Sequence, residues 1–138
     1  PDSEKPYQIH SDLQEMMQNL VGIVRTDHEL KQAVEELEKL KIRAGKTRIS
    51  GHREYNNGWH TALDLQNLLT ISEAITLSAI ERKESRGAHF REDFPEKDEA
   101  YGKFNTVVRK TVDGEMQVET RALPEMREDL KQIIAEMK

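Results

Sequence analysis

The segment from Trp59 to about Lys83 limits what this chain can fold into more than any other. It is predicted to form one long helix whose apolar side chains cover more than half of the circumference instead of a single stripe. These side chains are Leu63, Leu65, Leu68, Leu69, Ile71, Ala74, Ile75, Leu77, Ala79 and Ile80. Such a helix is expected at the centre of a domain, contacted from two sides, because one contact face would leave much apolar surface in water.

The first of two helices that precede this segment is expected to follow a loop. Residues 1–9 are predicted to form that loop, because Pro6 limits regular structure there. Ser11 and Asp12 carry side chains that can cap the start of a helix running to about Val21. Its apolar side chains recur at helical spacing on one face. This face is expected to pack on the central helix.

The second helix has the clearest start signal in the sequence. Thr26 is followed three residues later by Glu29, which is the pattern of a capping box. An apolar stripe follows directly, formed by Leu30, Ala33, Val34, Leu37 and Leu40. A polar connection over residues 45–58 then leads to the central helix. Three helices with antiparallel neighbours make a bundle, so the chain is expected to be mainly α.

The hydrophobic period changes after residue 95. Two runs rich in β-forming residues, 104–112 and 115–121, flank Asp113-Gly114, and this arrangement predicts a β-hairpin. A last amphipathic segment runs from Pro124 to Lys138. At 138 residues the chain is expected to be one fragment with two parts. These are a three-helix bundle over residues 10–95 and a hairpin with a C-terminal helical tail over residues 100–138.

Composition and motifs exclude several classes of function. The net charge of -5 and a pI near 5.6 argue against a nucleic-acid binder. No apolar run approaches the roughly 20 residues needed to span a bilayer, so no direct membrane insertion is expected. There is no cysteine, and the five histidines (His10, His28, His52, His60 and His89) show no metal-ligand spacing. No glycine-rich dinucleotide fingerprint or nucleophile elbow occurs either. The sequence therefore predicts no catalytic, cofactor-binding or metal-binding residue on this chain.

A dense cluster of charge follows the predicted central helix, over residues 82–95. One interpretation is structural: basic side chains up to Arg86 complement the negative helix end, which Gly87 terminates, and Arg91 pairs with a neighbouring carboxylate. The other is that Arg86, His89 and Arg91 meet an anionic ligand or a partner domain, since arginine can grip carboxylate or phosphate oxygens with two hydrogen bonds. Helix-end complementation explains the residues only as far as Arg86. We therefore favour a domain interface.

The same segment resembles a known family. The run KESRGAHFREDFP over residues 83–95 is similar to a signature in the C-terminal domain of succinate dehydrogenase and fumarate reductase flavoprotein subunits. Residues 13–26, Trp59, the run LQNLL over residues 65–69 and the tail LPEM over residues 123–126 resemble that family in the same order. The resemblance covers nearly the whole chain.

The resemblance implies a three-helix, spectrin-repeat-like bundle with a β extension, attached to a larger flavin-binding region of the same polypeptide. That region would hold FAD and interconvert succinate and fumarate, and an iron–sulfur subunit would take the electrons. Arg86, His89 and Arg91 would face the flavin domain, while this chain alone would be inactive and bind no FAD. The chain, which starts without an initiator Met, is expected to be a piece of such a polypeptide. The parent complex would place it on the cytoplasmic or matrix side, peripheral to the membrane.

Two alternatives remain open from the sequence. The C-terminal domain of L-aspartate oxidase shares a helical bundle and a similar Glu-Ser-Arg-Gly run, but the Arg91-Glu92-Asp93 run and the hairpin favour the succinate dehydrogenase side. The other alternative is a free-standing helical interaction module with no redox role. A free module would bury its own apolar face, whereas a docked domain would leave an apolar patch exposed beside residues 86–91.

Overall fold

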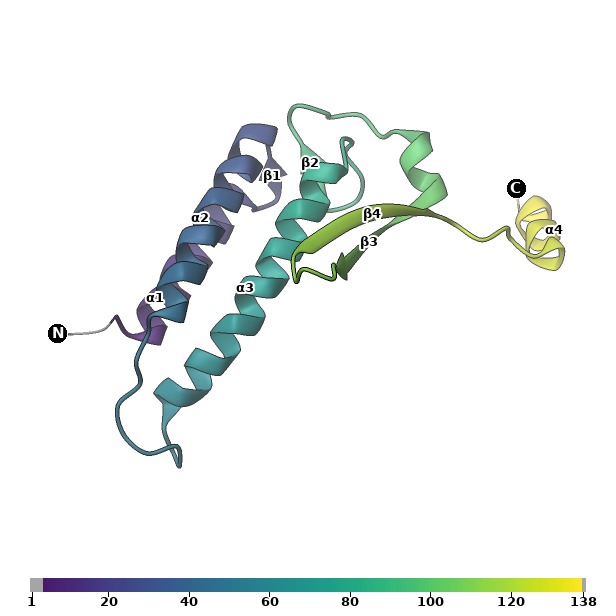
Figure 1. Ribbon diagram of the computed structural model, residues 1–138. Helices are drawn as coiled ribbons and strands as arrows, with labels where there is room; N and C mark the ends of the chain where they lie inside the picture. The colour runs from purple at the N-terminus through teal and green to yellow at the C-terminus, as the bar shows by residue number, and fades with distance from the viewer. Residues whose placement is uncertain (1–3, 138) are drawn as a thin grey trace.

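Three helices form the body of the molecule, as expected. The computed structural model describes residues 4–137, with α1 at Pro6–Leu20, α2 at Asp27–Gly45 and α3 at Asn57–Glu81. The three helices pack lengthwise, and the core lies between them (Figure 1). Its largest cluster is formed by Ile9, Leu13, Leu37, Leu40, Ala44, Leu65 and Leu69. The prediction of a mainly α fold with a helical bundle is confirmed.

The first helix begins earlier than the sequence indicated. Pro6 is its first residue, and the predicted caps at Ser11 and Asp12 lie inside the helix. Proline suits this position because the first N–H groups of a helix have no intrahelical acceptor, so none is lost. The predicted loop over residues 1–9 is therefore wrong from Pro6 onward, and its residues 1–3 lie outside the described part of the chain.

The second helix starts where its capping signal predicted. The Thr26 hydroxyl oxygen accepts a hydrogen bond from the Glu29 N–H at 3.2 Å, and its own O–H donates to the Glu29 carboxylate at 2.8 Å. Leu30, Ala33, Leu37 and Leu40 are buried. The backbone N–H of Asp27, the first residue of α2, donates a hydrogen bond to the Asp93 carboxylate at 3.1 Å, so the start of α2 lies next to the charged segment.

The central helix is contacted from two sides, but the contact is incomplete. α1 and α2 cover one side, and the hairpin of β3 (Phe104–Lys110) and β4 (Met116–Ala122) crosses another (Figure 1). Four large apolar side chains on α3 are exposed, namely Leu63 (54%), Leu68 (36%), Ile71 (56%) and Ile75 (44%). The chain therefore leaves part of its most apolar helix without a partner.

The hairpin forms where the sequence predicted it, and its two strands are antiparallel. β3 and β4 pair antiparallel from Phe104 opposite Ala122 to Lys110 opposite Met116, and Gly114 in the turn has φ +93°. After β4 an extended arm leads to α4 at Glu128–Glu136, which lies apart from the bundle (Figure 1). The predicted amphipathic tail thus contains a shorter helix, and Lys138 lies outside the described residues. Its apolar side chains Leu130, Ile133 and Ile134 are exposed.

One pairing of two β-strands was not indicated by any pattern in the sequence. β1 (Val24–Arg25) lies between α1 and α2 and pairs in parallel with β2 (Phe90–Arg91). This two-residue ladder holds the charged segment against the start of α2. Among the described helices, none has the length and apolar composition to cross a bilayer.

Candidate functional site

The charged segment folds back on itself immediately after α3. The helix ends at Glu81, and Arg86 and His89 then exchange two backbone hydrogen bonds of 2.8 and 3.1 Å across a two-residue turn. Gly87 has φ +59° as the first residue of that turn, a conformation that glycine adopts at little cost. The prediction that Gly87 ends the long helix is therefore wrong, because the helix stops earlier and the glycine serves the turn.

Glu84 is the buried anchor of the segment, with no exposed surface. Arg86 grips its carboxylate with two hydrogen bonds of 2.9 and 3.1 Å, and Arg82 pairs with the same group. The Asp98 N–H donates a further bond at 2.9 Å. Burial alone would raise the pKa of Glu84, but these donors outweigh it and lower the pKa to about 2. The segment is thus organised around a buried carboxylate that is charged at neutral pH.

Arg91 lies inside the fold and is 0% exposed. Its guanidinium donates two hydrogen bonds to the Asp93 carboxylate, at 2.8 and 2.7 Å, and one to the Ala79 carbonyl at 2.9 Å. The hydrogen bonds from Arg91, opposed by burial, lower the pKa of Asp93 to about 2. Arg91 therefore fastens β2 to the end of α3. Its partner Asp93 is a neighbouring carboxylate, as in the structural interpretation, and Arg91 is enclosed while Asp93 stays partly exposed.

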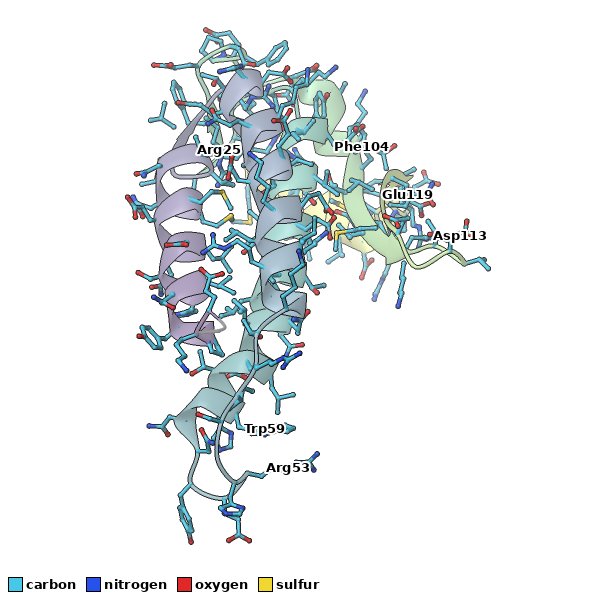
Figure 2. The ribbon with its side chains drawn as sticks, turned by 60° about the vertical axis from the view of Figure 1, so that its left-hand side comes forward. Arg25, Arg53, Trp59, Phe104, Asp113 and Glu119 are labelled. Carbon is cyan, nitrogen blue, oxygen red and sulfur yellow. The ribbon has the colours of Figure 1, made fainter. Side chains whose placement is uncertain are left out.

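His89 is half-buried and bridges two arginines. Its Nε2 lies 3.0 Å from the Arg82 carbonyl oxygen, and its Nδ1 lies 2.8 Å from Nη1 of Arg25. Burial, together with the charges of Arg25, Arg91 and Arg82, lowers the pKa of His89. Arg25 comes from β1, and Figure 2 shows it at the end of the bundle opposite Trp59 and Arg53.

The structure brings the three predicted site residues into one network, with different exposure. Arg86 keeps 31% of its side chain exposed, His89 is half-buried, and Arg91 is enclosed. A contact with a second domain stays a prediction for all three. Sequence reasoning missed Glu84 and Arg25. The alternation of Arg82, Glu84 and Arg86 could have indicated an ion pair at Glu84. No local pattern could have indicated Arg25, because 64 positions separate it from His89.

Apolar side chains flank the network on the surface. Ile23 is 75% exposed and Val24 53%, while Phe90 and Phe94 are 39% and 38% exposed. They belong to or adjoin the β1–β2 ladder, so they lie beside the charged segment. Within residues 4–137 there is no group of three or more His, Asp or Glu side chains arranged to hold a metal ion. The site thus combines charge and exposed apolar surface, as a docking surface does.

Comparison with known proteins decides the family. A family model described as "Fumarate reductase flavoprotein C-term" matches residues 10–134, which includes the whole charged segment. The chain belongs to this family. The resemblance seen in the sequence is therefore confirmed.

Relatives of this fumarate reductase C-terminal family member include named flavoprotein subunits. A fumarate reductase flavoprotein subunit of Mycobacterium tuberculosis is 35% identical over 83% of this chain and 20% of its own length. A succinate dehydrogenase flavoprotein subunit of Coxiella burnetii is 37% identical over 70% of this chain and 17% of its own length. The solved structure "Mycobacterium smegmatis Sdh1 in complex with UQ1" matches 95% of this chain with a TM-score of 0.88 and 37% identity.

The family member described here spans about a fifth of the length of these relatives. L-aspartate oxidase is also a relative: the Acinetobacter baylyi protein is 38% identical over 62% of this chain and 15% of its own length. The relatives of this chain thus include enzymes with different names, a fumarate reductase subunit and an L-aspartate oxidase among them.

Proposed function

We propose that this chain is the C-terminal accessory domain of an FAD-dependent flavoprotein subunit that interconverts succinate and fumarate. In this proposal the flavin-binding domain of the same polypeptide carries the catalytic residues, and an iron–sulfur subunit takes the electrons. The parent complex lies on the cytoplasmic or matrix side of a membrane, to which this domain is peripheral. The domain itself supplies a docking surface and no catalytic group.

The observation that carries this proposal is the apolar surface beside the charged segment. Ile23, Val24 and Phe90 are exposed next to a network whose ion pairs are largely satisfied within the chain. A free-standing module gains nothing from such exposure, because burying this surface would stabilise it by about 25 cal/mol per Å². The exposure supports a partner that covers this edge, and the family supplies a flavin domain as that partner.

The charge at this edge suggests what the docked surface does. Arg86 and His89 lie at the surface, and Arg25 and Arg82 lie directly behind His89. In this proposal the guanidinium groups at this edge stabilise negative charge across the interface, including that of a reduced, anionic flavin. Arg91 acts from inside by holding β2 in place.

A substrate assay on the full-length parent subunit tests the proposed reaction. The parent is expected to reduce an artificial electron acceptor with succinate and to reduce fumarate with a reduced dye. The alternative favoured by the L-aspartate oxidase relative predicts aspartate-dependent hydrogen peroxide formation instead. Peroxide formation from aspartate, with no succinate oxidation, would replace the proposal by that alternative.

Arginine variants in the same parent test the docking surface. Arg86→Ala is expected to lower flavin loading and succinate oxidation, while Arg48→Ala, in the exposed loop before α3, serves as the matched control. Arg91→Ala is expected to lower both as well, through loss of the hydrogen bonds from the enclosed guanidinium to Asp93 and to the Ala79 carbonyl. Unchanged flavin loading and activity in both variants would contradict the proposed docking role of this surface.

A further inference from the structure

Arg25 is a half-buried cation whose charge is not neutralised within the described chain. Its Nε donates to the carbonyl oxygens of Gly22 at 2.7 Å and Val21 at 3.2 Å, and its Nη1 meets His89. Among residues 4–137, no carboxylate lies within ion-pairing distance of it. Arg82, Arg86 and Arg91 all have such a partner, so Arg25 stands apart from its neighbours.

The hydrogen bonds of His89 indicate that its imidazole is neutral. The Arg82 carbonyl can only accept, so Nε2 of His89 carries a hydrogen. The Arg25 guanidinium can only donate, so Nδ1 is unprotonated. The imidazole is therefore neutral. It orients Arg25 and leaves the full positive charge of the guanidinium unpaired.

Arg25 lies at one end of an open groove between α3 and β3. Arg82 and His89 line the same end. The groove continues along α3 past Ile75 and Ile71 to Val108 of β3, and all three of these apolar side chains are exposed. The surface therefore offers an apolar trough that ends in an unpaired guanidinium.

We infer that this groove receives a segment of the flavin-binding region in which an aspartate or glutamate side chain adjoins apolar residues. The carboxylate pairs with Arg25, and the apolar neighbours cover Ile71 and Ile75. This inference rests on the proposed function, because it takes the parent polypeptide as the source of the segment.

Charge and shape favour a protein segment over a small anion. A small dicarboxylate would satisfy Arg25 but leave the apolar trough in water, whereas a peptide segment covers both. Continuity points the same way, since Arg25 forms β1 with Val24, which is exposed at the proposed docking edge. A partly buried guanidinium without a counter-ion also costs free energy, which an incoming carboxylate recovers.

Photo-crosslinking in the full-length parent subunit tests the inference. A benzophenone amino acid replaces Ile75, and in a second experiment Ile71, and mass spectrometry identifies the peptide that each probe captures. Both probes are expected to capture one peptide of the flavin-binding region that contains Asp or Glu. Tyr55, which is fully exposed at the far end of the bundle, carries the probe in the control and is expected not to capture that peptide.

Charge variants of Arg25 separate its charge from its structural role. Arg25→Gln keeps a donor for the Gly22 carbonyl but removes the charge, and Arg25→Lys keeps both. Loss of a buried ion pair at an interface lowers affinity by about tenfold or more, so Arg25→Gln is expected to lower the crosslink yield about tenfold. Arg25→Lys and the control Arg48→Gln are expected to keep most of it.

Three results would overturn the inference. They are a captured peptide without a carboxylate, capture of a different polypeptide, and an Arg25→Gln yield equal to that of Arg25→Lys. The flavin content and succinate oxidation of the unmodified parent are measured first. A parent that lacks both contradicts the proposed function, whereas an active parent with one of the three results contradicts only the groove and its occupant.

Discussion

Replacing Glu84 by glutamine removes the buried charge on which the docking segment is built. The pKa of this carboxyl falls from its ordinary value of 4.5 to about 2 in the folded chain, which corresponds to about 3 kcal/mol of stability. Breaking a buried ion pair costs about 3–5 kcal/mol. Because Arg82 and Arg86 retain 20% and 31% exposure and can recruit water, the lower end applies. Glu84→Gln is expected to lower the free energy of unfolding by about 3 kcal/mol at pH 7.

The same linkage gives the prediction a pH signature. The folded pKa lies below the unfolded one, so the contribution is complete above about pH 4.5 and is lost as the pH falls toward 2. The difference between the native chain and Glu84→Gln is therefore expected to shrink below pH 4.5.

Urea titrations of the 138-residue chain at several pH values measure this difference. Glu36→Gln is the matched control, because Glu36 forms a surface pair with Lys39 and should cost at most about 0.5 kcal/mol. If Glu84→Gln costs no more than Glu36→Gln at pH 7, the segment is not organised around this charge.

Three further predictions concern the same end of the bundle. Thr26→Ala removes the cap of α2 and is expected to cost about 1 kcal/mol in a urea titration, whereas Thr26→Ser should cost much less. Gly87→Ala is expected to lower the free energy of unfolding by about 1–2 kcal/mol through backbone strain, because the residue has φ +59° and the added side chain would meet nothing within 4 Å. An unchanged free energy of unfolding would contradict that conformation. Burial and three neighbouring arginines lower the pKa of His89, so the unfolded chain binds a proton at this imidazole more readily and stability is expected to fall as the pH drops below about 6.5. His89→Gln is expected to flatten this part of the plot of stability against pH, and an unaltered slope would refute the neutral imidazole.

The sequence predicted the elements that depend on local signals. The Thr26 capping box and the Asp113-Gly114 turn each specify a local geometry, and the structure has a helix start and a hairpin at these places. Pro6 misled the prediction because a proline that disfavours a helix interior is compatible with a helix start, and only the following residues decide which applies.

The candidate site depended on tertiary contacts that no local pattern encodes. The run around Arg86 marked the right segment, but the burial of Arg91 follows from the β1–β2 ladder, which joins residues 66 positions apart. Arg25 gains its place only through that pairing. The exposed face of α3 had a similar origin: its apolar composition predicted contact from two sides but not that part of one side would remain open.

The flavin content of purified protein tests the central claim most directly. The 138-residue chain and the full-length parent subunit are purified in parallel, and the absorbance spectrum of each is recorded. The account predicts a flavin spectrum for the parent and none for the chain alone, because the chain supplies a docking surface and no cofactor site. A stoichiometric flavin bound to the chain alone would contradict it.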